Sequence, residues 1–238
     1  MRVDFHTHIL PEIDDGSRSV EQSLEMLAAQ KARGIEIVVA TPHFYPQEDR
    51  PEKFLRRREK AFDRLTGAAK GKGLPEIIKG AEVYYFSGIS SWDGLRDFAI
   101  EGTDYLLLEM PAGKWTERML DEVRAIHSRQ GLVPIIAHLD RYINIFTAGR
   151  TVKKLEEMAV VIQANSSFFT DKKTARLAMK MLKDGCIDII ASDCHNTGTR
   201  PPDLDKVRGL LAEKRGAEYI NRIEKTEERL LPKFLNIL

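Results

Sequence analysis

The 238-residue chain has only two cysteines, Cys186 and Cys194, which are too few for a disulfide framework. It has no apolar run approaching the roughly 18 residues of a membrane-spanning helix, and its first residues lack the apolar core of a signal peptide. The chain also has no large excess of charge of either sign, because 37 basic and 36 acidic side chains leave a formal net charge of +1. No global field therefore favours nucleic acid or an anionic membrane as a partner. We expect a cytoplasmic protein that is not inserted in a membrane and does not bind nucleic acid.

Short apolar runs alternate with helical patterns along the whole chain, without a repeat, linker or low-complexity stretch. This alternation predicts an α/β fold with a parallel sheet, and the number of runs at this length favours a barrel in one domain, residues 1–238. The seven predicted strands are 2–5, 35–40, 77–81, 105–108, 133–137, 160–164 and 187–192. The predicted helical segments are 19–34, 51–69, 92–98, 117–129, 153–158 and 172–183, followed by a mainly helical region from 201 to 238.

Two of these helices carry further local signals. Ser19 followed by Gln22 resembles a capping box, which predicts a helix start at this point. In the helix over 51–69, apolar residues at helical spacing should face inward. The run Arg56-Arg57-Arg58 should form its solvated face.

Polar side chains stand where each predicted strand ends, which is where catalytic groups gather in parallel barrels. Five of the six histidines occupy such positions, and only His127 falls within a predicted helix, where we expect it to be solvated. His6 and His8 alternate along a strand and should project to the same side. Together with one loop aspartate, the strand-end residues predicted to bind metal are His6, His8, Asp15, His43, Glu82, Glu109, His138, Asp193 and His195.

A ligand set of imidazoles and carboxylates without thiolate suits manganese, iron or catalytic zinc. Nine candidate ligands are more than one ion can use, so the sequence predicts two or three divalent ions, with a carboxylate such as Glu82 bridging. Such clusters typically stabilise the attacking and leaving oxygens of a displacement at phosphorus. Asp14 is less favoured as a ligand than Asp15, which stands next to Gly16.

The segments around these residues resemble the PHP (polymerase and histidinol phosphatase) superfamily over nearly the whole chain. Within it, they resemble the bacterial manganese-dependent tyrosine-protein phosphatases of capsule and exopolysaccharide loci. The segments that carry the resemblance are His6-Thr7-His8, Asp15-Gly16, Thr41-Pro42-His43, residues 80–85, residues 137–142 and residues 191–196.

The resemblance implies a distorted (β/α)7 TIM-like barrel with three metal ions, manganese first among the candidates. It also implies that Arg141 and Arg200 handle phosphate, a role that suits a guanidinium fork. The expected substrate is the phosphotyrosine-bearing tail of a bacterial tyrosine kinase that controls polysaccharide synthesis. Whether the chain forms a homo-oligomer stays open. By the same resemblance, one ion would take His6, His8, Glu82 and Asp193, a second Glu82, Glu109 and His138, and a third Asp15, His43 and His195.

Other interpretations remain open from the sequence. Cys194 and Arg200 have the C-x5-R spacing of cysteine-dependent phosphatases, but Pro201-Pro202 removes two N–H groups that such a phosphate loop needs. A small-molecule phosphatase of the same superfamily, acting on histidinol phosphate, would share the metal chemistry. A non-catalytic metal-holding module is a third alternative. Residues 84–86, Tyr-Tyr-Phe, could stack on a phosphotyrosine ring or belong to the core.

Overall fold

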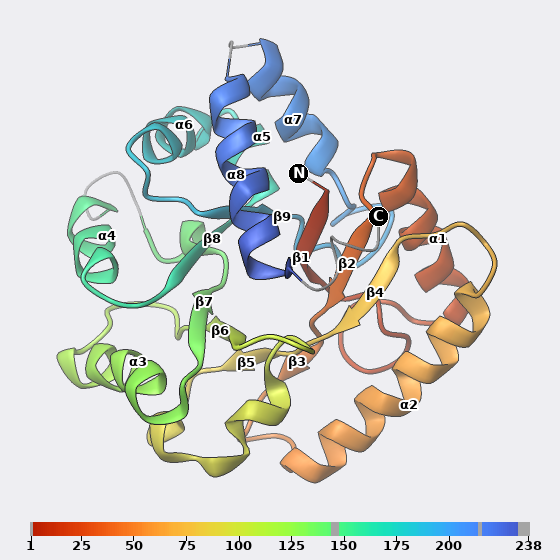
Figure 1. The fold of residues 1–238 in the computed structure, drawn as a ribbon, viewed down its shortest axis with the longest axis horizontal. Coiled ribbons are helices and arrows are strands. Elements are labelled where there is room, and N and C mark those ends of the chain that lie inside the picture. Colours follow the sequence, from red (N-terminus) through yellow and green to blue (C-terminus); the bar gives the residue numbers. More distant parts are fainter. Residues whose placement is uncertain (1, 144–147, 214–215, 233–238) are drawn as a thin grey trace.

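Short parallel strands form the centre of the protein, whose computed structural model describes residues 2–143, 148–213 and 216–232. Helices surround these strands on the outside (Figure 1). The strands are β1 (Val3–Thr7), β2 (Ile37–Ala40), β3 (His43–Phe44), β4 (Glu76–Lys79), β5 (Glu82–Tyr84), β6 (Tyr105–Glu109), β7 (Val133–Ile136), β8 (Val161–Asn165) and β9 (Ile189–Ala191).

The helices follow the predicted positions closely. Ser19 caps the first of them, because its side chain accepts a hydrogen bond from the Gln22 N–H. Three short helices, η1, η3 and α5, were not predicted. The predicted C-terminal helical region has residues 214–215 and 233–238 outside the described part. The helices are α1 (Val20–Ala32), α2 (Pro51–Ala69), η1 (Ile89–Ser91), η2 (Asp93–Phe98), α3 (Glu117–Gln130), η3 (Leu139–Arg141), α4 (Ala148–Glu156), α5 (Ser166–Thr170), α6 (Ala175–Lys183), α7 (Leu204–Glu213) and α8 (Ala217–Leu230). Within the described residues, no helix has the length and apolar character that a bilayer crossing requires.

The strands pair into a three-stranded sheet, β1-β2-β4, and a curled six-stranded sheet, β3-β5-β6-β7-β8-β9. Every pair of strands is parallel. Beyond β9, the described part of the chain meets β1 through one isolated bridge, between Thr7 and Cys194. Because all these strands run the same way, their C-terminal ends face one side of the protein.

Two of the predicted strands are each followed by a short further strand that was not predicted, β3 and β5, so the described residues contain nine strands instead of the expected seven. Thr41-Pro42 separates β2 from β3, and Gly80-Ala81 separates β4 from β5. Pro42 cannot donate a backbone hydrogen bond, so it interrupts a ladder. A Cβ atom at Gly80 would lie only 3.2 Å from Val39 Cγ1, so the close approach of the chains favours glycine there. The interruption places His43 and Glu82 side by side, as partners in the β3–β5 register.

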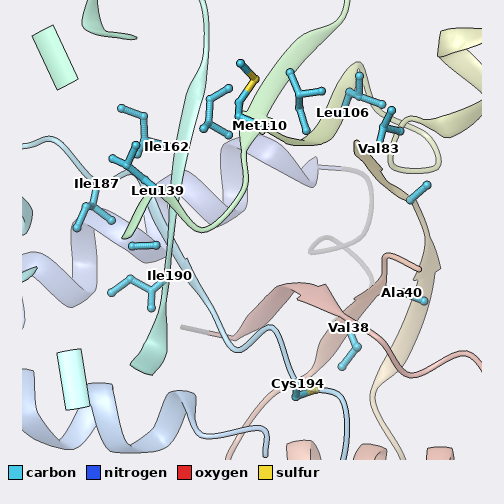
Figure 2. Close-up of a cluster of buried hydrophobic side chains, with 14 of the residues drawn as sticks. Val38, Ala40, Val83, Leu106, Met110, Leu139, Ile162, Ile187, Ile190 and Cys194 are labelled. Carbon is cyan, nitrogen blue, oxygen red and sulfur yellow. The ribbon is translucent and has the colours of Figure 1, made fainter. Parts of the chain in front are cut away.

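Apolar side chains cover both faces of the strands. Val38 of β2 belongs to the larger buried cluster, which also contains helix residues such as Phe54 and is shown in part in Figure 2. The neighbouring Val39 belongs to a second cluster, which Leu230 of α8 and Leu231 join. Alternate residues of one strand thus bury opposite faces, which explains the nearly continuous apolar runs in the sequence.

The interpretation of residues 56–58 as a solvated face is wrong for one residue. Arg56 and Arg57 are exposed, but Arg58 is buried on the same side of α2 as Phe54. Its guanidinium donates to the carbonyl oxygens of Gly80 (3.1 Å) and Asp97 (2.9 Å). Buried carbonyl groups outside a regular ladder need donors, and a long cationic side chain at helical spacing supplies them here.

Candidate metal centre

All nine side chains predicted as metal ligands meet at the C-terminal side of the strands. Each lies within 4.0 Å of at least one other member, so the nine form one continuous cluster. His127, which was expected to lie apart, is exposed on α3. The cluster consists of His6, His8, Asp15, His43, Glu82, Glu109, His138, Asp193 and His195.

Glu82 lies at the centre of this cluster. Its Oε2 atom is 3.1 Å from His6 Nε2, 3.3 Å from His8 Nε2 and 2.9 Å from His43 Nδ1. Its other oxygen, Oε1, is 2.7 Å from His138 Nε2. Burial would raise the pKa of this carboxyl, but His6 and His138 hold it well below its usual range. Glu82 is therefore an ionised carboxylate with one oxygen on each side of the cluster, which is the geometry of a bridging ligand.

His6 in β1 and His8, directly after the strand, face each other through their Nε2 atoms. His8 Nδ1 lies 2.7 Å from Asp14 Oδ2, and His6 Nδ1 lies 3.3 Å from Gln163 Oε1, so each Nδ1 can donate its proton to an acceptor oxygen. The two Nε2 atoms lie 3.1 Å apart. Facing imidazole nitrogens surrounded by carboxylates favour a cation between them, and either a proton or a metal ion can fill that role.

Several buried atoms of the cluster make no hydrogen bond within the described residues. A buried carboxylate oxygen or imidazole nitrogen without a partner is costly, and a metal ion is one way to satisfy it. The donor set of oxygen and imidazole nitrogen atoms suits a divalent cation. The residues present therefore fit divalent ions. The unsatisfied atoms are His43 Nδ1, Glu82 Oε2, Glu109 Oε2, His138 Nδ1, Asp193 Oδ1 and His195 Nε2.

The ligand atoms fall into three groups that overlap the sets expected from the family resemblance. Within each group they lie within 4.8 Å of one another. His138 belongs to none of the three, although its Nε2 atom is 3.6 Å from Glu109 Oε1. The division of ligands among ions stays a prediction. The groups are His8-Asp15-His43-His195, His6-His8-Asp193 and His43-Glu82-Glu109.

Asp14 contacts two of the candidate ligands, His8 and His43, without belonging to the candidate set itself. Its carboxylate faces His8 Nδ1 and accepts hydrogen bonds from the backbone N–H groups of Gly16 and His43, both at 3.0 Å. Burial would raise the pKa of Asp14, but the charge and hydrogen bond of His8 lower it to about 2. Asp14 thus orients a ligand, whereas Asp15 projects its carboxylate between His43 and His195.

Glu109 occupies a different electrostatic environment. Burial and the nearby charge of Glu82 raise the pKa of Glu109 to about 7. Two carboxylates that share one site disfavour each other's ionisation, and a cation between them removes this penalty.

Arg141 and Arg200 lie together at the rim of the cluster. Their Nη2 atoms are 2.6 Å and 2.8 Å from the same oxygen, Asp193 Oδ2. Arg141 follows His138 in η3, and Arg200 ends the loop after His195. Both side chains remain partly exposed, so their guanidinium groups can reach a bound anion.

The sequence did not single out Gln163, although it links several candidate ligands. Its Oε1 accepts from the His138 backbone N–H at 2.6 Å, and its Nε2 donates to Asn165 Oδ1 at 2.9 Å. Asn165 in turn donates to Asp193 Oδ2 at 3.0 Å. The signal in the sequence is a glutamine within the apolar strand β8, two residues before the strand-end asparagine.

The structure opposes the cysteine-phosphatase interpretation. Cys194 is fully buried and packed in the larger apolar cluster, and burial raises the pKa of its thiol well above the usual range. A protonated, inaccessible thiol is a poor nucleophile. Arg200 points at Asp193 rather than at the sulfur.

Replacing Cys194 with serine should therefore change the turnover of a phosphate ester less than about threefold, because the side chain only fills space. Initial rates at matched metal content would measure this. Loss of turnover in a folded Cys194→Ser variant with normal metal content would restore the cysteine mechanism.

The fold and the cluster define a class of protein: a parallel α/β protein with several groups of candidate metal ligands and two arginines at their rim. The family model described as "Capsular polysaccharide synthesis, CpsB/CapC" matches residues 2–231, so the chain belongs to this family. This membership confirms the resemblance drawn from the sequence motifs.

Curated relatives share the family over most of their length. The chain is 28% identical to tyrosine-protein phosphatase CpsB of Streptococcus pneumoniae, with 91% of this chain and 92% of the relative covered. It is 25% identical to tyrosine-protein phosphatase YwqE of Bacillus subtilis, with 96% and 91% covered.

Solved structures share the fold. One from the pair YwqE of Bacillus subtilis and CpsB of Streptococcus pneumoniae, described as metal-dependent tyrosine phosphatases, has a TM-score of 0.82 at 23% identity, covering 97% of this chain and 94% of that chain. Histidinol phosphate phosphatase from Lactococcus lactis, solved with zinc, has a TM-score of 0.57 at 15% identity, covering 94% and 93%.

Proposed function

We propose that this protein is a metal-dependent protein-tyrosine phosphatase. The observation that carries the proposal is the cluster of buried carboxylate and imidazole atoms that find no hydrogen-bond partner among the described residues, with Arg141 and Arg200 beside it. Membership of the CpsB/CapC family and its similarity to relatives named tyrosine-protein phosphatases support the same conclusion.

The two arginines would bind the phosphoryl group and neutralise charge that develops on its oxygens. Asp193 holds both guanidinium groups at one point, so a phosphoryl oxygen near that point would meet two donors. When bound, divalent cations supply Lewis-acid stabilisation and an acidified water for attack at phosphorus. The phenol of tyrosine has a pKa of about 10, so it leaves with less help from a proton donor than an alkyl alcohol needs.

We further propose that manganese is the physiological metal, with iron or zinc as alternatives, and that the protein is cytoplasmic. The substrate would be the phosphotyrosine-bearing tail of a bacterial tyrosine kinase that regulates capsular or exopolysaccharide synthesis. The strand pairings support a distorted (β/α)7 barrel that forms one domain over residues 1–238.

A comparison of substrates tests this function. With manganese present, kcat/KM for a phosphotyrosine peptide should exceed kcat/KM for histidinol phosphate by about 100-fold, because the rim rather than the metal chemistry selects the substrate. Phosphate release measures both rates, and a phosphoserine peptide of the same sequence serves as the control. Faster turnover of histidinol phosphate would favour the small-molecule phosphatase. Absence of turnover on all three substrates, with metal bound, would indicate a non-catalytic module.

A further inference from the structure

A cavity of about 530 Å³ lies directly beside the metal-type cluster. Its volume is within the range of about 300–1,000 Å³ that small-ligand pockets usually show. Asp15 and His43 line it and also belong to the cluster, so the cavity and the cluster are continuous. The aryl ring of a phosphotyrosine is joined to phosphorus through one oxygen and must therefore lie close to these residues. The full lining is Ile13, Asp14, Asp15, His43, Tyr45, Glu48, Asp49, Lys53 and Arg57.

Tyr45 forms an aromatic wall of this cavity. Its ring stacks on His43 with a centroid distance of 5.0 Å and an interplanar angle of 28°. It also packs against Tyr84 at 5.5 Å, so two neighbours hold the ring in place. Tyr45 follows directly on the short strand β3, which fixes the backbone next to it. A preorganised aromatic ring binds another ring at low entropic cost.

The cations of the cavity do not make it an anion site. Arg57 forms an ion pair with Asp49 and also approaches the Ile13 carbonyl oxygen at 3.4 Å. The Lys53 ammonium group lies 3.9 Å from the same aspartate. Ile13 adds a buried apolar surface. The cavity therefore combines an aromatic ring and an apolar side chain with charged residues, among which the acidic ones outnumber Lys53 and Arg57. An excess of negative charge disfavours an anion in this cavity but not an uncharged ring.

The aromatic residues on the other side of the cluster are less suited to this role. Tyr142 lies 5.6 Å from His138, but its hydroxyl accepts a hydrogen bond from the Met110 N–H and Trp115 packs against its ring at 5.1 Å. Tyr85, one of the three aromatic residues considered from the sequence, is buried and donates to Glu122. Tyr142 and Tyr85 therefore already pack against or bond to other residues of the protein, which leaves less of either ring free to contact a substrate.

We propose that Tyr45 determines specificity by stacking on the aryl ring of the substrate in this cavity. The inference rests on the proposed phosphatase function and goes beyond it by assigning the leaving group to a particular subsite. It predicts that aryl phosphates are preferred to alkyl phosphates because of one side chain, independently of the metal ligands.

Binding of two inert analogues tests the proposal without requiring turnover. Dissociation constants of phenylphosphonate and methylphosphonate would be measured by calorimetry on the manganese-loaded full chain. We expect wild type to bind phenylphosphonate about tenfold more tightly, which is about 1.4 kcal/mol. Tyr45→Ala should abolish this preference, while Tyr45→Phe should retain it. Tyr219→Ala, which removes a tyrosine packed on Arg222 of α8, is the matched control and should keep the wild-type ratio.

Two outcomes would overturn the assignment. One is an unchanged ratio in Tyr45→Ala, and the other is an equal loss of affinity for both analogues, which would mean that Tyr45 only supports His43. Tyr45→Leu, which keeps most of the volume, repeats the test if the alanine variant binds less metal by elemental analysis. A preserved ratio pattern in a protein that fails to hydrolyse phosphotyrosine would reject the proposed function but leave this subsite in place.

Discussion

Removing divalent cations with a chelator should lower the turnover of a phosphotyrosine peptide by at least about 10³-fold, and manganese should restore it. The expected size follows from the several kcal/mol of transition-state stabilisation that metal ions supply, at about 1.4 kcal/mol for each factor of ten. Elemental analysis of the same samples would show whether two or three ions bind per chain. Parallel additions of zinc and iron would show which cation supports the fastest turnover.

The Cys194→Ser variant is the control for this experiment. It should lose and regain activity in step with wild type, because the buried thiol takes no part in the chemistry. Turnover that persists in a sample shown to be free of metal would contradict the proposed mechanism. Recovery in wild type but not in Cys194→Ser would contradict the purely space-filling role of the cysteine.

Replacing Glu82 with alanine should be the most damaging single substitution in the cluster, with kcat lowered by about 10³-fold or more. The carboxylate contacts four histidines, and its two oxygens face different sides of the cluster. Its loss would therefore weaken more than one ion at once and leave His6, His8 and His43 without a common anionic partner. Steady-state kinetics with titrated manganese would separate a loss of metal affinity from a loss of rate.

Glu122→Ala is a matched control for this substitution. Glu122 is a partly buried glutamate that accepts hydrogen bonds from the Tyr85 hydroxyl and the Gly88 N–H, and it lies outside the metal-type cluster. It should retain metal content and most of the activity even if its stability falls. Near-normal turnover and a full complement of ions in Glu82→Ala would refute the bridging role.

Much of this site could be predicted because a parallel sheet converts sequence order into spatial proximity. A polar residue at the end of an apolar run is easy to recognise, and the ends of parallel strands meet whatever the intervening helices contain. His138 and Asp193 lie 55 residues apart in the sequence, yet both are within reach of Glu82 or His6. The helix over residues 51–69 could be predicted equally well, because a proline starts it and apolar residues repeat at helical spacing.

Other features depend on tertiary contacts that carry no local signal. Arg58 looks like its exposed neighbours in the sequence, and only the carbonyl groups of Gly80 and Asp97 explain its burial. The register of β1 against β2 shifts between Asp4 and Thr7, and His6 lies within this irregular stretch. The regular alternation of side chains that a sequence predicts does not reveal such a shift. Asp193 and His138 adopt positive φ angles of 53° and 32°, a costly conformation for residues other than glycine that sequence patterns do not reveal.

The backbone contact between β1 and the segment after β9 is sparse: one isolated bridge at Thr7 and Cys194, with hydrogen bonds from Asp193 N to His6 O and from His8 N to Cys194 O. His6 and His8 stand on one side of this seam, and Asp193 and His195 on the other. Ions held by both pairs would cross-link β1 and the segment after β9 across this sparse backbone contact. Scarcity of divalent cations in the cell would then weaken the contact between β1 and the segment after β9, as well as lower the activity.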